Sequence, residues 1–402
     1  MNQEKSTVFL PNILIPKNTD ASFMHAWSVI ACDQFTSDRS YWNELDGEIG
    51  ENPSTLRLVF PEVFLKDPDG EKRVENINRN MRAYLEKGLF RRLDKGFVLT
   101  ERTTRFTSEK RYGVVLAIDL EEYSFAPKSS AAIRATEATV PERIPPRVKI
   151  RQEAKLELPH VMLLYNAYES QILGEIEREI PALEKLYDFE LNQGGGHLKG
   201  WFLNEEKSKE IINKLYRTSG EMLFAVGDGN HSLATAKTCW ENIKKSLSEE
   251  EQKTHPARFA LCEAVSIYSK ALTFEPIYRY ISGVDAEKFI TKLEKRNTFK
   301  MIREGNTLSL QGEYDVAEAL RALDGFIAEY LKDNGGEVDY IHGEKELVSL
   351  VQAGNDRVGV LLKAIAKDGF FRAVEQGGSL PRKTFSMGEG AEKRYYTECK
   401  EI

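Results

Sequence analysis

The chain has 402 residues, of which 41% are hydrophobic and 30% charged, and its formal net charge is −7. This length supports two or three domains whose cores need no disulfides. The acidic balance argues against nucleic acid or an anionic membrane surface as the main partner, and no apolar run is long enough for a membrane span.

Cysteine usage indicates a reducing compartment. The four cysteines are Cys32, Cys239, Cys262 and Cys399. They form no Cys-x-x-Cys pair and match no zinc spacing, so we expect free thiols. The N-terminal stretch is charged and broken by prolines, which makes it a poor signal peptide. We therefore predict a cytoplasmic protein.

The N-terminal region mixes helices and strands. Apolar spacing predicts a helix over residues 74–90, with a stop signal at Gly88. Residues 96–103 and 112–120 are rich in Val, Leu and aromatic side chains, which predicts two strands. We expect these strands to pair antiparallel through the polar loop at residues 108–110.

A connection rich in Pro and Arg follows, over residues 126–150. Its prolines, which discourage regular structure, are Pro127, Pro141, Pro145 and Pro146. We expect a long helix after it, then a strand at residues 160–165 and a helix over residues 169–187.

Three consecutive glycines, Gly194 to Gly196, permit a tight or mobile loop before His197. A strand at residues 198–203, a helix at 205–217 and a strand ending at Val226 are predicted next.

The sequence pattern changes after Pro276. Helices are predicted over residues 286–296 and 316–332. A β-α-β-α rhythm then covers residues 338–341, 344–353, 357–362 and 369–376. The predicted fold is mixed α/β with three regions, 1–125, 126–283 and 284–402, the middle one carrying the candidate site.

That site centres on the stretch Gly227-Asp-Gly-Asn-His-Ser232, between a buried strand and an amphipathic helix. The first turn of a helix has free N–H groups and a positive dipole end, which suits phosphate or carboxylate. This dipole contributes only about 0.3–1 kcal/mol, whereas micromolar binding needs about 8 kcal/mol. Other side chains must therefore contribute.

Within this turn, Asp228 and His231 are candidate acid–base partners. Gly227, Gly229, Asn230 and Ser232 are the candidate anion-binding positions. The alternative is a tight turn that only caps the helix. Neither a Walker loop nor a dinucleotide fingerprint is present here.

Other candidates lie outside the turn. Glu137 could act as a general base or help to hold Mg²⁺, and Arg134 could bind a phosphate; the alternative is a solvated loop of mixed charge. His197 could meet a ligand from a mobile flap, or lie on a flexible surface loop. Lys383 could supply a cation from a strand, or belong to an exposed basic tail.

The remaining histidines are isolated in the sequence, and we treat them as structural or surface residues. They are His25, His160, His255 and His342.

The turn resembles the Ala-Asp-Gly-His-His-Arg motif of the DUF1015 family, whose activity is not established. Ile133-Arg-Ala-Thr-Glu-Ala-Thr139 is similar to its Ile-Arg-Pro-His-Glu-x-Thr motif. Phe274–Arg279 resembles its Leu-Pro-Thr-His-Arg segment, and Pro381–Thr384 its Pro-x-Lys-Ser-Thr segment. Ala31-Cys-Asp-Gln34 stands where the family has Pro-Tyr-Asp, and His197 where it has a His before a Leu-Trp pair.

This resemblance covers nearly the whole chain and implies a shared set of site residues. The retained positions are Asp228, Gly229, His231, Glu137, Arg279 and Lys383. The chain departs from the family at Asn230, Ser232, Ala135-Thr136 and Tyr278. A weaker similarity links the motif to ParB/sulfiredoxin-like domains, which bind nucleotide phosphates at a helix start. It implies a central domain of that type.

These observations lead to one main hypothesis. We expect a kinase-like phosphotransferase that acts on a small hydroxyl-bearing metabolite, such as an amino acid, with ATP or ADP and Mg²⁺. The alternatives are a non-catalytic nucleotide or metabolite sensor and a phosphate-ester hydrolase. We expect a small-molecule partner and neither nucleic acid nor a membrane; the sequence does not determine the metal or the oligomeric state.

Overall fold

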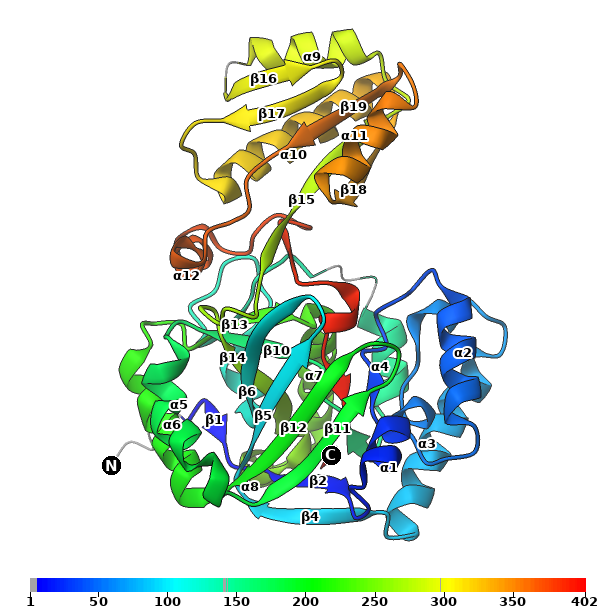
Figure 1. Cartoon of the computed structure of the whole chain (residues 1–402), viewed down its shortest axis with the longest axis vertical. Helices are drawn as coiled ribbons and strands as arrows, with labels where there is room; N and C mark the ends of the chain where they lie inside the picture. The colour runs from blue at the N-terminus through cyan, green and yellow to red at the C-terminus, as the bar shows by residue number, and fades with distance from the viewer. Residues whose placement is uncertain (1–5, 140–141, 143, 297) are drawn as a thin grey trace. The chain divides into compact units, whose positions relative to one another are not determined.

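The computed structural model describes residues 6–139, 142, 144–296 and 298–402. It confirms the predicted mixed α/β class (Figure 1). Met1–Leu272 together with Glu389–Ile402 forms one compact unit, and Thr273–Gly388 forms a second. Regions 1–125 and 126–283 therefore lie largely in the first unit. The division into three regions stays a prediction.

A mixed sheet organises the first unit, in the order β11-β12-β5-β6-β14-β10-β13-β8-β7, with β1 beside β6. The strands are β1 Val8–Phe9, β5 Phe97–Thr104, β6 Thr107–Asp119, β7 Tyr123–Ser124, β8 Ile133–Ala135, β10 Met162–Tyr165, β11 Lys185–Leu191, β12 Gly196–Leu203, β13 Phe224–Asp228 and β14 Phe259–Ser266. β5 and β6 pair antiparallel as predicted, but residues 108–110 belong to β6 and the turn lies just before them.

Three smaller pairs complete the strands of this unit. β2 Asn12–Pro16 pairs with β4 Phe90–Lys95, β3 Val29–Ile30 with β21 Tyr395–Tyr396, and β9 Leu156–Glu157 with β22 Lys400–Glu401. The last two pairs tie the C-terminal segment, residues 389–402, to elements from the first half of the chain.

Eight α-helices of the described residues belong to this unit. They are α1 Ala21–Trp27, α2 Arg39–Ile49, α3 Gly70–Glu86, α4 Ile144–Arg151, α5 Glu169–Glu179, α6 Glu205–Thr218, α7 Asn230–Ile243 and α8 Glu249–Thr254. The helix predicted at residues 74–90 is α3, which ends before Gly88, a residue with φ of 63°.

Two helix predictions were wrong in part, and proline explains both. The predicted helix 169–187 stops at α5, where Pro181 follows in a short 3₁₀ turn, and its end becomes β11. The predicted long helix after residue 150 is instead α4. Pro145 and Pro146 lie in its first turn, where a missing N–H costs nothing. Pro141 lies outside the described residues.

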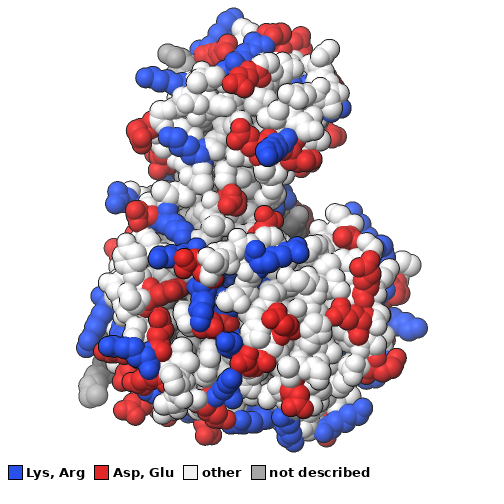
Figure 2. All heavy atoms as spheres, in the orientation of Figure 1, with Lys and Arg blue, Asp and Glu red and all other residues white. Residues whose placement is uncertain are grey.

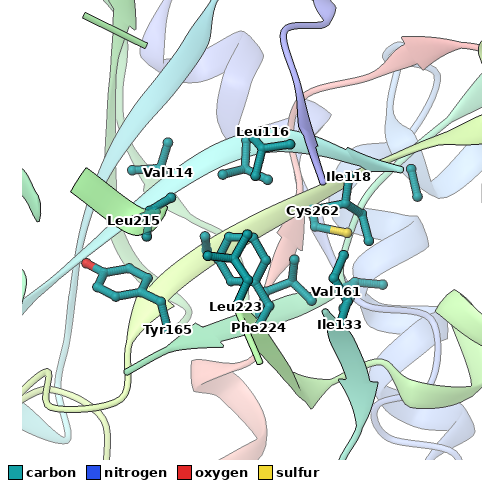
Figure 3. Close-up of a cluster of buried hydrophobic side chains, with 14 of the residues drawn as sticks. Val114, Leu116, Ile118, Ile133, Val161, Tyr165, Leu215, Leu223, Phe224 and Cys262 are labelled. Carbon is teal, nitrogen blue, oxygen red and sulfur yellow. The ribbon is translucent and has the colours of Figure 1, made fainter. Parts of the chain in front are cut away.

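Hydrophobic cores cover both faces of the large sheet. Figure 3 shows one cluster, to which Leu116 of β6, Cys262 of β14 and Phe224 of β13 contribute. α7 packs its apolar stripe, which includes Leu233 and Trp240, into this same cluster. Burying a side chain such as Leu233 contributes about 2 kcal/mol to stability. Because these side chains pack into the cluster beneath the sheet, they hold α7 against it.

The second unit has a sheet in the order β16-β17-β19-β15-β18. Its strands are β15 Phe274–Ser282, β16 Lys300–Glu304, β17 Thr307–Gln311, β18 Glu337–His342, β19 Arg357–Leu361 and β20 Phe385–Met387, and its helices are α9 Ala286–Lys295, α10 Val316–Asn334, α11 Glu344–Gln352 and α12 Lys367–Gly377. All six elements predicted after Pro276 are present. β18 and β19 flank β15 and both run antiparallel to it.

Surface charge is mixed on the face shown in Figure 2, where Lys and Arg alternate with Asp and Glu over both units. In the described part of the chain, no helix combines the length and apolarity needed to cross a membrane.

Candidate functional site

The turn between β13 and α7 has the predicted strand–turn–helix form. β13 ends at Asp228, Gly229 is the N-cap with φ 84° and ψ 26°, and α7 begins at Asn230. A Cβ on Gly229 would lie 3.1 Å from the Val161 Cα, so both the backbone conformation and the space require glycine. Because glycine has no side-chain acceptor, the N-cap position leaves the first-turn amides of α7 to other partners.

The structure brings the motif at residues 134–137 to this turn. β8 runs parallel to β13, with Ala135 opposite Val226, so both strands end at the same edge. The Thr136 amide donates to Asn230 Oδ1 at 3.2 Å, and the Thr136 hydroxyl donates to the Val226 carbonyl at 2.6 Å. Glu137 follows directly and is partly exposed. The two motifs are therefore neighbours.

A cation reaches this edge from the C-terminal segment. Lys393 Nζ lies 3.8 Å from Asp228 Oδ2, and the two side chains are 11% and 20% exposed. Arg111 of β6 is buried near the same carboxylate. Burial lowers the pKa of Arg111, while the charges of Glu263 and Asp228 act in the opposite direction. The site thus holds acidic and basic groups from four parts of the chain.

Arg102 of β5 holds the C-terminal segment in place. Its Nε and one Nη donate to the Gly195 carbonyl at 3.2 and 2.7 Å. Its Nη groups also donate to the carbonyls of Ala391, Glu392 and Lys393 at 2.6, 3.1 and 2.6 Å. A guanidinium has five N–H donors, and all five are used. Burial, with the nearby charge of Arg111, lowers the pKa of Arg102 to about 9.

The triglycine turn supports the same segment. A Cβ on Gly195 would lie 2.4 Å from the Tyr395 hydroxyl oxygen, and that hydroxyl donates to the Asn192 carbonyl at 3.0 Å. Gly196 has φ 87° and lies against the Thr103 carbonyl. Close packing of Gly195 against Tyr395 and of Gly196 against Thr103 requires glycine at these two positions. A mobile ligand flap stays a prediction.

His197 lies away from the turn. Four strands separate β12 from β13 in the sheet, and His197 Nδ1 and Nε2 bond Glu190 and Asp188 at 2.7 and 2.6 Å. Partial burial alone would lower the pKa of His197, but its bonds to the two carboxylates raise it above the ordinary value. The expected convergence of Glu137, His197 and the turn is therefore not found for His197.

The three predicted phosphate-binding cations have other positions. Arg134 is buried on β8, and its Nε donates to the Ala131 carbonyl at 2.9 Å, toward the start of the strand. Arg279 and Lys383 belong to the second unit. Lys383 is exposed, with φ 58°, and its carbonyl accepts a bond from Arg279 at 2.8 Å.

Arg279 is fully buried and fully bonded. Its Nε and one Nη donate to the two carboxylate oxygens of Asp324 at 2.9 and 2.8 Å. The other donors go to the carbonyls of Ile277, Arg382 and Lys383. Since its five donors are engaged inside the protein, Arg279 has none left for a phosphate in this structure.

His160, which the sequence predicted to be a structural or surface residue, adjoins the turn. A Cβ on Gly229 would lie 3.5 Å from His160 Cδ2. His160 Nδ1 bonds the Tyr396 hydroxyl at 2.9 Å, and its Nε2 lies 3.9 Å from Asp33 Oδ1. Desolvation, with the charge of Asp33, raises the pKa of the neighbouring Cys32 to about 12, so this thiol is neutral.

Some of these missed residues had a signal in the sequence. Asp33 lies in the stretch compared with the Pro-Tyr-Asp motif. Nothing in the sequence pattern marked His160, Arg111 or Lys393, because strand pairing and the returning C-terminal segment place them here.

A cavity of about 320 Å³ lies elsewhere in the first unit, between α2 and α3. Trp42, Phe60 and Arg57 are among its lining residues. Arg57 pairs with Asp46 and donates to the Gly50 carbonyl, so its guanidinium serves the local structure. No predicted site residue lines this cavity.

Metal-binding clusters are absent from the described ranges: no group of three or more His, Cys, Asp or Glu is placed to hold an ion. All four cysteines are free, as predicted.

Comparison with known proteins adds a family. A family model described as "Protein of unknown function (DUF1015)" matches residues 15–377. No curated protein matches the chain. Among solved structures, a variant of a free serine kinase in complex with ADP is similar at 11% identity and TM-score 0.39, covering 74% of this chain and 94% of that one.

Two further solved structures show the same level of similarity. A conserved hypothetical protein from Pyrococcus furiosus has 11% identity and TM-score 0.36, covering 72% of this chain and 94% of that one. A C-terminally truncated SbnI from Staphylococcus aureus has 9% identity and TM-score 0.36, covering 68% and 82%. At such TM-scores the likeness carries no argument about activity.

Proposed function

The chain belongs to the DUF1015 family, and from its own site we propose that it is a phosphotransferase acting on a hydroxyl group of a small metabolite, such as an amino acid. One observation carries this proposal: a glycine-capped helix start lies beside Asp228 and the segment that ends in Glu137. Such a helix start binds anions, and the two carboxylates supply acid–base groups next to it.

ATP or ADP with Mg²⁺ fits the residues at this edge. Gly229 keeps the helix start free of a capping side chain, and the buried Arg111 Nε has no hydrogen-bond partner among the described residues. Mg²⁺ in such sites is held by one or two carboxylates and by phosphate oxygens, and Asp228 and Glu137 would be those carboxylates. When bound, the ion and nucleotide would supply charge neutralisation and the phosphoryl group.

The chain's own residues would perform the remaining tasks. The amides of residues 230–232 orient the phosphate oxygens, and the Asn230–Thr136 bond fixes the two motifs against each other. Glu137 or Asp228 takes the proton of the acceptor hydroxyl, and His231 exchanges a proton with the transferred group. Phosphoryl transfer depends mainly on positioning and charge stabilisation, which this arrangement provides.

The test uses the purified full chain with ATP, ADP or pyrophosphate and a panel of hydroxyl-bearing metabolites. Mass spectrometry should detect one phosphorylated metabolite. Glu137→Gln and Asp228→Asn should each lower the rate by about 10²-fold or more, since general acid–base catalysis contributes about 10²–10⁴-fold. Glu249→Gln, on the exposed start of α8, is the matched control and should leave the rate unchanged.

Other outcomes identify the alternatives. Ligand-induced thermal stabilisation that His231→Ala abolishes, without turnover of any acceptor, would indicate a sensor. Release of inorganic phosphate without an acceptor would indicate a hydrolase. Neither binding nor turnover with any of the three donors would contradict the proposal.

A further inference from the structure

The C-terminal segment contributes a lysine, Lys393, whose ammonium lies near Asp228 but donates no hydrogen bond among the described residues. We propose that Lys393 binds the phosphoryl oxygens of the ligand at the start of α7, with Arg102 as the positioning residue that places it. This inference rests on the proposed function. It gives the site a cation other than Arg134, Arg279 and Lys383, the cations that the sequence predicted there.

The first argument is the state of the Lys393 ammonium. Its side chain is 11% exposed, and its nearest charged partner, Asp228 Oδ2, lies at 3.8 Å. Among the described residues it has this one ionic neighbour and no hydrogen bond. An ammonium has three donors, and enclosing it without partners is costly. A bound anion would satisfy these donors.

A second lysine of the same segment shows the contrast. Lys400 is 8% exposed and also lies near a carboxylate, with Nζ 3.9 Å from Glu157 Oε2. Unlike Lys393, it donates to the carbonyls of Pro256 and Glu401, each at 2.9 Å. Lys400 is therefore bonded within the fold, whereas Lys393 has donors to offer.

The position of Lys393 is fixed by its own backbone. Arg102 donates to its carbonyl at 2.6 Å and to the two preceding carbonyls. Arg111 donates to the Glu392 carbonyl at 3.1 Å. The segment at residues 391–393 is thus held from the sheet by two buried guanidiniums, and the pre-set side chain loses little entropy on binding.

A buried polar atom near Asp228 gives an independent indication of a ligand. Arg111, whose charge interacts with that of Asp228, is 7% exposed, and its Nε has no hydrogen-bond partner among the described residues. Buried polar groups are normally satisfied, so the unpartnered Arg111 Nε indicates a missing partner.

The test measures ADP binding to the full chain by calorimetry, with pyrophosphate as a second probe. Lys393→Met should lower the affinity for both ligands at least tenfold, and Lys393→Arg should recover part of the lost affinity. Lys400→Met, matched in burial, charge and segment, should leave both affinities unchanged. Equal weakening of ADP and pyrophosphate would place Lys393 on phosphate rather than on the nucleoside.

A measurement on the wild-type chain covers the case in which Lys393→Met does not fold. Acetylation of lysines, followed by mass spectrometry, should be slower at Lys393 when ADP is present and unchanged at the exposed Lys87. If wild type binds ADP but neither Lys393→Met affinity nor Lys393 labelling changes, this inference is overturned and the proposed function stands. If wild type binds neither probe, both are overturned.

Discussion

Each compact unit contains a buried arginine whose five donors are all bonded, yet the two arginines do different things. Arg279 in the second unit pairs with Asp324 and holds the loop at residues 382–384. Arg102 in the first unit donates its hydrogen bonds only to carbonyls, and it joins the turn at Gly195 to the segment at 391–393. The family motif includes Arg279, whereas the site that we propose lies in the region around Arg102.

The difference shows why a buried cation in a motif is not necessarily a ligand group. Arg279 has a carboxylate partner, so its charge is already compensated inside the fold. Arg102 compensates no carboxylate directly; it organises backbone and thereby places another cation, Lys393, beside Asp228. Arg279 therefore stabilises only its own surroundings in the second unit. Arg102 positions a residue of the candidate site in the first unit.

Replacing Arg102 should give the largest effect. Arg102→Met removes five hydrogen bonds and leaves the carbonyls of Gly195, Ala391 and Lys393 short of a donor, while the Glu392 carbonyl keeps its bond from Arg111. Each unmet buried group costs about 1–3 kcal/mol. We expect a loss of about 4 kcal/mol or more in the free energy of unfolding, measured by urea denaturation. Hydrogen exchange should rise over residues 389–402, and ADP affinity should fall. Unchanged exchange in that segment would contradict the claim that Arg102 holds it in place.

Arg279→Met should cost somewhat less. It removes the partner of Asp324, whose side chain is 28% exposed, and the donor of the Ile277, Arg382 and Lys383 carbonyls. Only the bond to Ile277 is fully buried, so water can solvate most of the groups left behind, whereas three of the Arg102 bonds are buried. We expect about 3 kcal/mol, at the low end for breaking a buried ion pair. Exchange should rise within residues 273–388 while ADP affinity stays the same. Lost affinity without lost stability would return Arg279 to the list of ligand-binding residues.

Gly229→Ala tests the role of the glycine at the start of α7. The left-handed backbone of Gly229 and its contact with Val161 oppose any side chain. Holding a non-glycine residue there costs about 1–3 kcal/mol. Thermal unfolding should show this loss, and ADP should no longer stabilise the protein because the helix start has shifted. Gly305→Ala, at φ 59° with nothing within 4 Å of the added Cβ, is the control for backbone strain alone.

The smallest effect concerns His197, which the structure assigns to its carboxylate partners. Its folded pKa is raised above the reference of 6.5. A raised histidine pKa stabilises the fold below the unfolded pKa, and this contribution is lost as pH rises through the folded pKa. His197→Gln should therefore cost up to about 1 kcal/mol near pH 6 and nothing near pH 9, with no change in ADP binding. A pH-independent cost would contradict this account.

Local sequence patterns predicted the fold better than the site. Helices α9 to α11 and their strands follow directly from apolar periodicity, because each pattern lies within one element. The turn at residues 227–232 and the motif at 134–137 were also identified, from the strand–turn–helix pattern and the family resemblance, and the structure places them at the ends of adjacent parallel strands. Periodicity failed where proline changed the local geometry, at α4 and after α5.

Long-range placement explains the remaining errors. His197 resembles a family position, but strand order puts four strands between it and the turn. Lys393 and His160 carry no motif; the first reaches Asp228 because Arg102 holds the returning segment, and the second because β10 lies beside β13. The similarity to ParB/sulfiredoxin-like domains stays a prediction.

The most direct test of the central claim is hydrogen exchange of the α7 first turn with and without ADP. If the amides of residues 230–232 bind phosphate oxygens, ADP should slow their exchange in the wild type and much less in Lys393→Met. Equal exchange at these amides under saturating ADP would contradict the account, because the ligand would then bind somewhere else.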